Sequence, residues 1–161
     1  MNDSAIPSYY DGANYQIDDS IGYLMRQIVG ISSAAIDDRM VAHGLTDAQW
    51  KPLLMIQQGQ CRTAAELARL ACSDAGAVTR LLDRVEAKGL VRRTRSQADR
   101  RVINLELTKE GESAAEVVPH VLADVLNTML AGFSEAEAQQ LKVLLQRVLN
   151  NTRQLRENGT A

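Results

Sequence analysis

Basic side chains crowd the middle of this 161-residue chain. The window from Arg80 to Arg101 holds eight Lys or Arg against three Asp or Glu, although the whole chain has a formal net charge of −2. Groups of this kind bind phosphates, and an Arg can also donate two hydrogen bonds to a guanine in the major groove. The charge asymmetry favours double-stranded DNA as the partner. The alternative is a chance fluctuation in an Arg-rich solvated surface.

Part of this charge falls on a helix predicted from about residue 74 to 88. Arg80, Arg84 and Lys88 recur every four residues, so they share one exposed side of the helix. We expect Arg80 to reach a base and Arg84 to contact a phosphate. Small and polar residues near the helix start would let the backbone approach DNA closely; they are Ser73, Asp74, Ala75, Gly76 and Thr79. An ordinary solvated face with ion pairs such as Arg80–Asp83 is the alternative.

The rest of the charge falls on a hairpin, because the hydrophobic period changes from 3.6 to 2 over residues 91–95 and 102–107. The end of the first strand and the loop supply Arg95, Asp99, Arg100 and Arg101. An Arg on such a loop can enter the narrow minor groove beside the helix. We expect Asp99 to hold one of the two loop guanidiniums in a bidentate pair. A surface ion pair that only closes the turn is the alternative.

Helical periodicity accounts for most of the remaining chain. Apolar residues at spacings of three and four predict further helices over about 18–42, 46–58, 63–70, 109–130 and 134–156. Three of these begin with capping boxes, at Thr46–Gln49, Thr63–Glu66 and Ser134–Glu137. A short helix, a tight turn, a longer helix and a hairpin make a winged helix-turn-helix. The predicted fold is mainly α with a small β-hairpin, with six helices and a helical dimerisation domain.

Several classes of protein are excluded. No uncharged run is long enough for a transmembrane helix, and no signal peptide is visible, so we expect a cytoplasmic protein without a membrane partner. The chain has no P-loop, Rossmann or hydrolase motif, and its two histidines, His43 and His120, are isolated. We therefore expect no enzyme, no cofactor and no metal site.

Two contiguous stretches resemble the MarR (multiple antibiotic resistance regulator) family. The stretch from Asp74 to Val91, DAGAVTRLLDRVEAKGLV, is similar to the family's recognition helix, and DRRVINLELTKEG, from Asp99 to Gly111, is similar to its wing and the following helix start. The outer helices agree in length and order. The resemblance implies a homodimer, with residues 1–45 as arm and dimerisation helix, 46–108 as DNA-binding lobe and 109–161 as further dimerisation helices.

A function is implied by the same resemblance. Two winged lobes would bind consecutive major grooves of an inverted-repeat operator, with Asp99 and Arg101 as the wing-tip pair and Arg101 in the minor groove. Family members typically repress transcription and release DNA when a small aromatic or phenolic ligand binds between the lobe and the dimer core. The candidate residues for such an effector are Tyr23, Arg26, His43, Trp50 and Met55. Plain roles in the core, at a helix end or in a surface ion pair are the alternatives for them.

Two other functions remain open at this point. A regulator controlled by thiol oxidation would use Cys61 or Cys72, and Cys72 is better placed because the field at the start of the next helix favours a thiolate. Buried, unreactive thiols are the alternative. A winged helix can also serve as a protein-interaction adaptor. Duplex binding that weakens steeply with salt would distinguish a DNA-binding protein from an adaptor.

Overall fold

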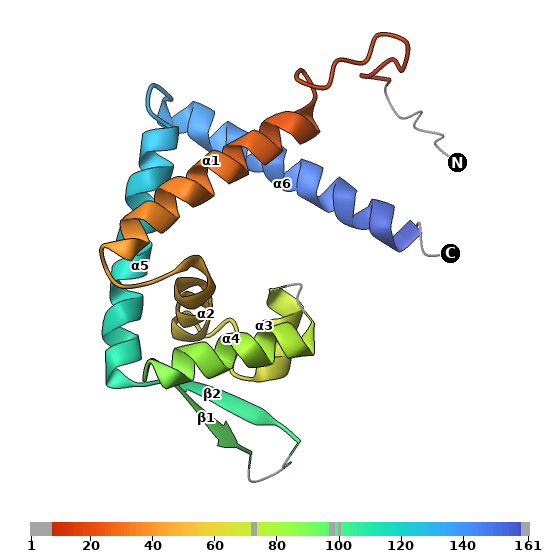
Figure 1. Cartoon of the computed structure of the whole chain (residues 1–161). Coiled ribbons are helices and arrows are strands. Elements are labelled where there is room, and N and C mark those ends of the chain that lie inside the picture. The colour runs from red at the N-terminus through yellow and green to blue at the C-terminus, as the bar shows by residue number, and fades with distance from the viewer. Residues whose placement is uncertain (1–7, 72–73, 97–98, 100, 159–161) are drawn as a thin grey trace.

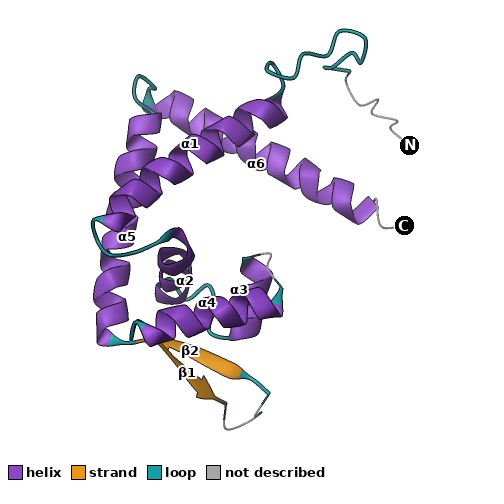
Figure 2. Ribbon diagram, in the orientation of Figure 1, coloured by secondary structure: helices purple, strands orange, loops and turns teal. Residues whose placement is uncertain are grey.

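A computed structural model describes residues 8–71, 74–96, 99 and 101–158 of the chain. Its regular structure consists of helices and one two-stranded antiparallel hairpin, with an isolated bridge between Thr63 and Asn104 and an irregular arm over residues 8–20 (Figures 1 and 2). Its elements are α1 (Ile21–Val41), α2 (Asp47–Gln57), α3 (Ala64–Leu70), α4 (Ala75–Ala87), β1 (Val91–Arg95), β2 (Ile103–Leu107), α5 (Lys109–Met129) and α6 (Glu135–Asn158). The predicted winged helix-turn-helix with six helices is confirmed.

Local capping sets most of the helix starts. At α3, the Thr63 hydroxyl accepts from the Glu66 N–H at 3.2 Å, and the Glu66 carboxylate accepts from the Thr63 N–H at 3.1 Å. The start predicted for the first helix was wrong by two residues. Ser20 rather than Asp18 caps α1, because its hydroxyl accepts from the Tyr23 N–H at 3.2 Å.

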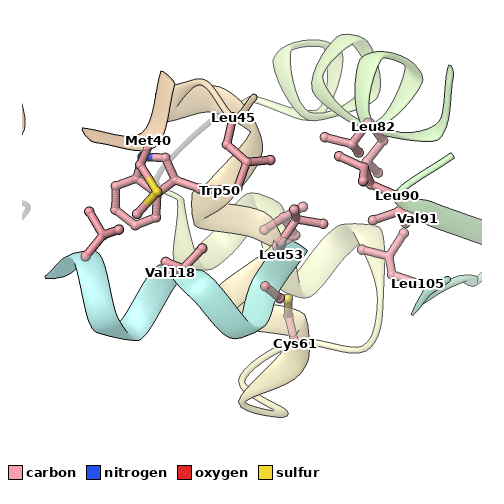
Figure 3. Close-up of a cluster of buried hydrophobic side chains, with 14 of the residues drawn as sticks. Met40, Leu45, Trp50, Leu53, Cys61, Leu82, Leu90, Val91, Leu105 and Val118 are labelled. Carbon is pink, nitrogen blue, oxygen red and sulfur yellow. The ribbon is translucent and has the colours of Figure 1, made fainter. Parts of the chain in front are cut away.

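One hydrophobic core lies where the helices of the lobe meet α5 and the hairpin. Figure 3 shows its labelled side chains, which are Met40, Leu45, Trp50, Leu53, Cys61, Leu82, Leu90, Val91, Leu105 and Val118. They come from α1, α2, α4, both strands, α5 and the connections between them. The core therefore fixes the winged lobe to the lower part of α5, which leads away from it towards α6 (Figure 1).

The opposite end of the molecule is different, because no residue of α6 whose side chain is described is buried. No other described element packs extensively against α6. Large apolar side chains stay exposed here on α1, α5 and α6, including Leu24, Met25, Ile28, Leu126, Met129, Leu144, Leu145 and Leu149. None of the helices in the described residues combines the length and apolarity that crossing a lipid bilayer requires.

Candidate nucleic-acid interface

The helix α4 presents one face to the core and the other to solvent. Val78, Leu82 and Val85 are buried and Leu81 packs against the same core, whereas residues 79, 80, 83 and 84 are exposed. Asp74 precedes the helix, and its carboxylate accepts from the Ala77 N–H at 2.8 Å. This hydrogen bond, helped by the Gly76 N–H and the charge of Arg80, lowers the pKa of Asp74 below its ordinary value. Asp74 is thus an ionised helix cap.

Arg80 lies over the first turn of the same helix. A Cβ built on Gly76 would be 3.5 Å from an Arg80 guanidinium nitrogen and 3.1 Å from the Asp74 carboxylate. Gly76 therefore leaves the space in which these two side chains lie close together. Thr79 is exposed, and its hydroxyl donates to the Ala75 carbonyl at 2.8 Å. The predicted residues at the start of the helix are brought together on one exposed surface, except Ser73, which lies outside the described residues.

The basic residues of the lobe separate into bonded and unbonded groups. Arg92 pairs with Glu106 across the hairpin. By contrast, Arg80, Arg84, Arg95 and Arg101 are exposed and form no ion pair with any residue that the structure describes. These four guanidinium groups are therefore open to a polyanion, and no sequence count separates them from their bonded neighbours. The ion pair Arg80–Asp83, weighed above as an alternative, does not form.

Arg93 is the most strongly bonded of these arginines, and sequence reasoning missed it. Its guanidinium contacts the Asp83 carboxylate at 2.8 Å and donates to Glu86 at 2.7 Å through Nε, while its backbone N–H donates to Glu86 at 3.2 Å. The guanidinium holds the pKa of Glu86 below its ordinary value. Since Asp83 and Glu86 belong to α4, Arg93 ties β1 to the recognition helix.

Lys88 is exposed, as predicted, but its ammonium group is bonded within the chain. Its ammonium group donates to the Gly44 carbonyl at 3.1 Å and to the side-chain oxygen of Gln49 at 3.0 Å. The sequence pattern could not indicate these bonds, because both acceptors are about forty residues away in sequence, in the turn after α1 and in the first turn of α2. Of the three exposed residues, Arg80 and Arg84 are the ones whose side chains are not tied to another described element.

Asp99 bonds to the backbone of the wing, whereas the prediction was a bidentate pair with a guanidinium. Its carboxylate accepts from the backbone N–H of Arg101 at 2.9 Å, and its carbonyl accepts from the Val102 N–H at 2.9 Å. This is an Asx turn, which fixes the main chain at Arg101 and leaves the guanidinium free. The bidentate pair is thus not formed with Arg101, and Arg100 lies outside the described residues.

The hairpin projects from the end of the molecule that is remote from α1 and α6 (Figure 1). Its strands pair from Val91 with Leu107 to Arg95 with Ile103. One consequence of this register is that Arg95 ends the paired region, directly before the loop. The unbonded arginines of α4 and of the hairpin therefore belong to one lobe, away from the exposed apolar helices.

The predicted effector residues do not form one cluster within the chain. Trp50 is 7% exposed and packs in the core, where its Nε1–H donates to Asp37 at 3.4 Å, and Met55 packs against the same core. His43 is exposed in the turn after α1. Tyr23 and Arg26 lie near the other end of α1, and 14 residues separate Arg26 from Met40, about 20 Å along a helix.

The cysteines give little support to redox control. Cys61 is buried in the core, and burial raises its thiol pKa, with a further contribution from the charge of Glu66. A buried thiol with a raised pKa is a poor nucleophile. Cys72 lies outside the described residues. Among the residues that the structure describes, no three His, Cys, Asp or Glu gather as metal ligands.

Comparison with known proteins identifies relatives with the same architecture. The MarR family model matches residues 45–103. The multiple antibiotic resistance protein MarR of Escherichia coli (strain K12) is 29% identical over 130 residues, which cover 80% of this chain and 90% of that protein. A mutant of the E. coli protein in complex with operator DNA superposes with a TM-score of 0.72 at 29% identity, covering 80% of this chain and 92% of that one.

A second complex supports the same assignment. The structure of S. aureus MepR bound to DNA has a TM-score of 0.74 at 25% identity, and the match covers 83% of this chain and 98% of that one. The family model spans the turn after α1, the helix-turn-helix and most of the hairpin, which contain the free arginines. Residues 45–103 are a MarR family domain, and over most of its length the chain is similar to a MarR protein whose structure has been solved with operator DNA.

Proposed function

We propose that two copies of this chain form a dimer that binds an inverted-repeat operator in the cytoplasm, represses transcription there, and leaves the DNA when a small aromatic ligand binds. The observation that carries this proposal is the set of four exposed arginines without ion pairs on α4 and the hairpin. Arg80 and Thr79 would face base edges, Arg84 and Arg95 would bind phosphates, and Arg101 would enter the minor groove.

The proposed dimer is supported by the exposed apolar residues on α1, α5 and α6. A 24-residue helix without extensive contacts in its own chain is stabilised mainly by packing of its apolar side against something else. A second copy fits, because it offers the same apolar surface under two-fold symmetry. Residues 46–108 would then read DNA, while 1–45 and 109–161 would join the two copies.

For the operator and the effector, the support differs in strength. The operator proposal is supported by the two relatives in complex with DNA, because the match covers 92% and 98% of their chains. The effector proposal rests on the junction of α1, α2 and α5, where the nearly buried Trp50 and the adjoining Met55 would have to be uncovered for a ligand to stack on them, while His43 is already exposed. Tyr23 and Arg26 would act at a second place, higher on α1. Thiol control by Cys61 is not favoured by its burial.

The direct test is selection of genomic DNA fragments by the purified chain, repeated with salicylate in the buffer. We expect enriched fragments to share an inverted repeat whose half-site centres are about 10 base pairs apart, or one helical turn. Salicylate or a similar aromatic acid should reduce their recovery. Fragments without any common repeat would contradict the operator proposal, and repeats that every such ligand leaves bound would contradict the effector proposal.

The wing is tested by Arg101→Ala. We expect at least about a tenfold loss of affinity for the selected site, because the substitution removes the minor-groove guanidinium while the Asp99 turn, which uses the backbone N–H, can still form. Fluorescence anisotropy at fixed salt measures the affinity, and circular dichroism checks the fold. Arg92→Ala is the matched control, since Arg92 is already paired with Glu106. Equal losses in both variants would contradict the assignment.

The recognition helix is tested by Arg80→Ala. A bidentate contact between an Arg and a guanine distinguishes bases by about 1–3 kcal/mol, so we expect one position of the repeat to lose its preference. Binding to a library of sites in which each position is varied in turn measures this. If Arg80 binds only a phosphate, affinity will instead fall uniformly for every sequence.

A further inference from the structure

The C-terminal end of the recognition helix is bonded on one side to the turn between α1 and α2. Lys88, which caps α4, donates to the Gly44 carbonyl at 3.1 Å and to the Gln49 side-chain oxygen at 3.0 Å. That oxygen also accepts from the Thr46 N–H at 3.1 Å, and Gln49 is only 6% exposed. The acceptor is thus held rigidly, and the carbonyl ends of α1 and α4 both favour a cation beside them.

On the other side, the same end of α4 touches the start of α5 with no space between them. The Thr108 N–H donates to the Leu90 carbonyl at 3.2 Å, and the Thr108 hydroxyl donates to Gly89. A Cβ built on Gly111 would lie 1.8 Å from the Leu90 oxygen. This contact is between backbones and leaves little freedom. The Lys88 bond runs through a flexible side chain, so it is the more easily released of the two.

Because these bonds lie at one end of α4, a small change in them would move the other end, which carries the surface that would meet DNA. Helix α4 has 13 residues and is therefore about 20 Å long. A rotation of about 10° around its C-terminal end would move its first turn, with Asp74 and Arg80, by about 3.5 Å, since each residue adds about 1.5 Å of length. Such a displacement exceeds what a hydrogen bond to a base edge tolerates.

We propose that Lys88 is a positioning residue, which sets the angle of the recognition helix by bonding it to the turn between α1 and α2. The inference rests on the proposed dimer on an inverted repeat, where two recognition helices must keep one spacing. Lys88 touches no DNA in this role. Whatever moves the turn at Gly44 moves the reading surface, which gives the exposed apolar helices and the DNA-binding face a direct mechanical connection.

Two variants break this bond from opposite ends. Lys88→Met removes the ammonium group and keeps most of the side-chain volume, and Gln49→Met removes the buried acceptor without changing any charge. We expect each to lower affinity for the selected inverted repeat about tenfold and to leave binding to an unrelated duplex within about twofold. The double variant should lose less than the sum of the two single losses, because both substitutions remove the Lys88–Gln49 hydrogen bond. Gln49→Met also removes the acceptor of the Thr46 N–H, and Lys88→Met also removes the bond to Gly44, so the difference between the double loss and that sum measures the shared bond. Lys88→Arg should restore most of the affinity.

The salt dependence separates this role from a phosphate contact. Loss of one phosphate contact lowers the slope of log affinity against log salt by about 0.9, so about 1.8 for a dimer. We expect an unchanged slope in both variants. A reduced slope in Lys88→Met, or full affinity for the repeat in Gln49→Met, would overturn the proposal.

Hydrogen exchange on the full-length free protein tests the bond without DNA. The amides of Leu45 and Leu90, which lie beside it, should exchange faster in both variants, while that of Val118 in the core should not change. Unchanged exchange at Leu45 and Leu90 would also overturn the proposal. If the unmodified chain bound no duplex at all, the proposed function would fail, yet this measurement would still decide whether Lys88 holds the helix end.

Discussion

Replacing Leu145 and Leu149 of α6 together by Asp is expected to convert the protein into a monomer that has lost at least about a hundredfold in affinity for its inverted repeat. Both side chains are exposed in the single chain, 43% and 44% respectively, and lie one turn apart on the same side of the helix. Buried in a dimer, the new carboxylates would have no partners. Two lobes that are no longer joined lose the effective concentration that linkage provides, typically a factor of about 10²–10⁴.

Light scattering during gel filtration measures the mass, and anisotropy with the repeat measures the affinity. Gln139→Asp is the matched control, because it adds a carboxylate to an exposed, polar position on the same helix. It should remain dimeric and bind normally. A double variant that stays dimeric would place the dimer contact elsewhere, and a monomer with undiminished affinity would remove the need for a dimer.

Gly111→Ala is expected to destabilise the protein by about 3 kcal/mol, at the upper end of what overpacking costs. On helix propensity alone, the same substitution would stabilise α5 by up to about 1 kcal/mol. The sign is reversed because Gly111 is buried, and its Cβ would be 1.8 Å from the Leu90 oxygen and 2.8 Å from the Leu90 carbonyl carbon. Both are backbone atoms of the turn that follows the recognition helix, so either α5 or that turn must move.

Thermal unfolding at one protein concentration measures this effect, since the stability of a dimer depends on concentration. A loss of this size corresponds to a fall of about 6–12 °C in the midpoint. Ser113→Ala, an exposed position two residues further along α5, is the control and should change the midpoint little. An unchanged midpoint in Gly111→Ala would show that the turn at Leu90 can yield, which would also weaken the argument that this contact is fixed.

Predictions from sequence succeeded where the bonding partners are close in the chain. Each capping box joins a residue to another three positions on, so the starts of α3 and α6 were predictable. Strand β1 was predicted with its bounds because alternation of polar and apolar residues is itself a local pattern. The wrong cap for α1 arose because Asp18 and Ser20 both have suitable side chains, and geometry selects one of them.

Assignments of single side chains were less successful, because the partners of these side chains are distant in the chain. Lys88 and Arg93 have the charge of a DNA contact, and their partners come from other elements of the fold. The residues considered for an effector, Trp50 among them, were grouped by chemical type. The structure places Trp50 in the core and Arg26 far along α1, because position along a helix axis separates residues that composition puts in one class.

What the sequence by itself determined is the resemblance to the MarR family, the order of helices and hairpin, and the concentration of positive charge in the winged lobe, since all of these follow from local pattern. Only the tertiary structure decided which arginines stay unbonded, how Asp99 holds the wing, and that the bonds of Lys88 and the contact at Gly111 hold the C-terminal end of α4 from two sides. These contacts join residues that are distant in the chain. Their existence depends on how the helices pack, and no local pattern records that packing.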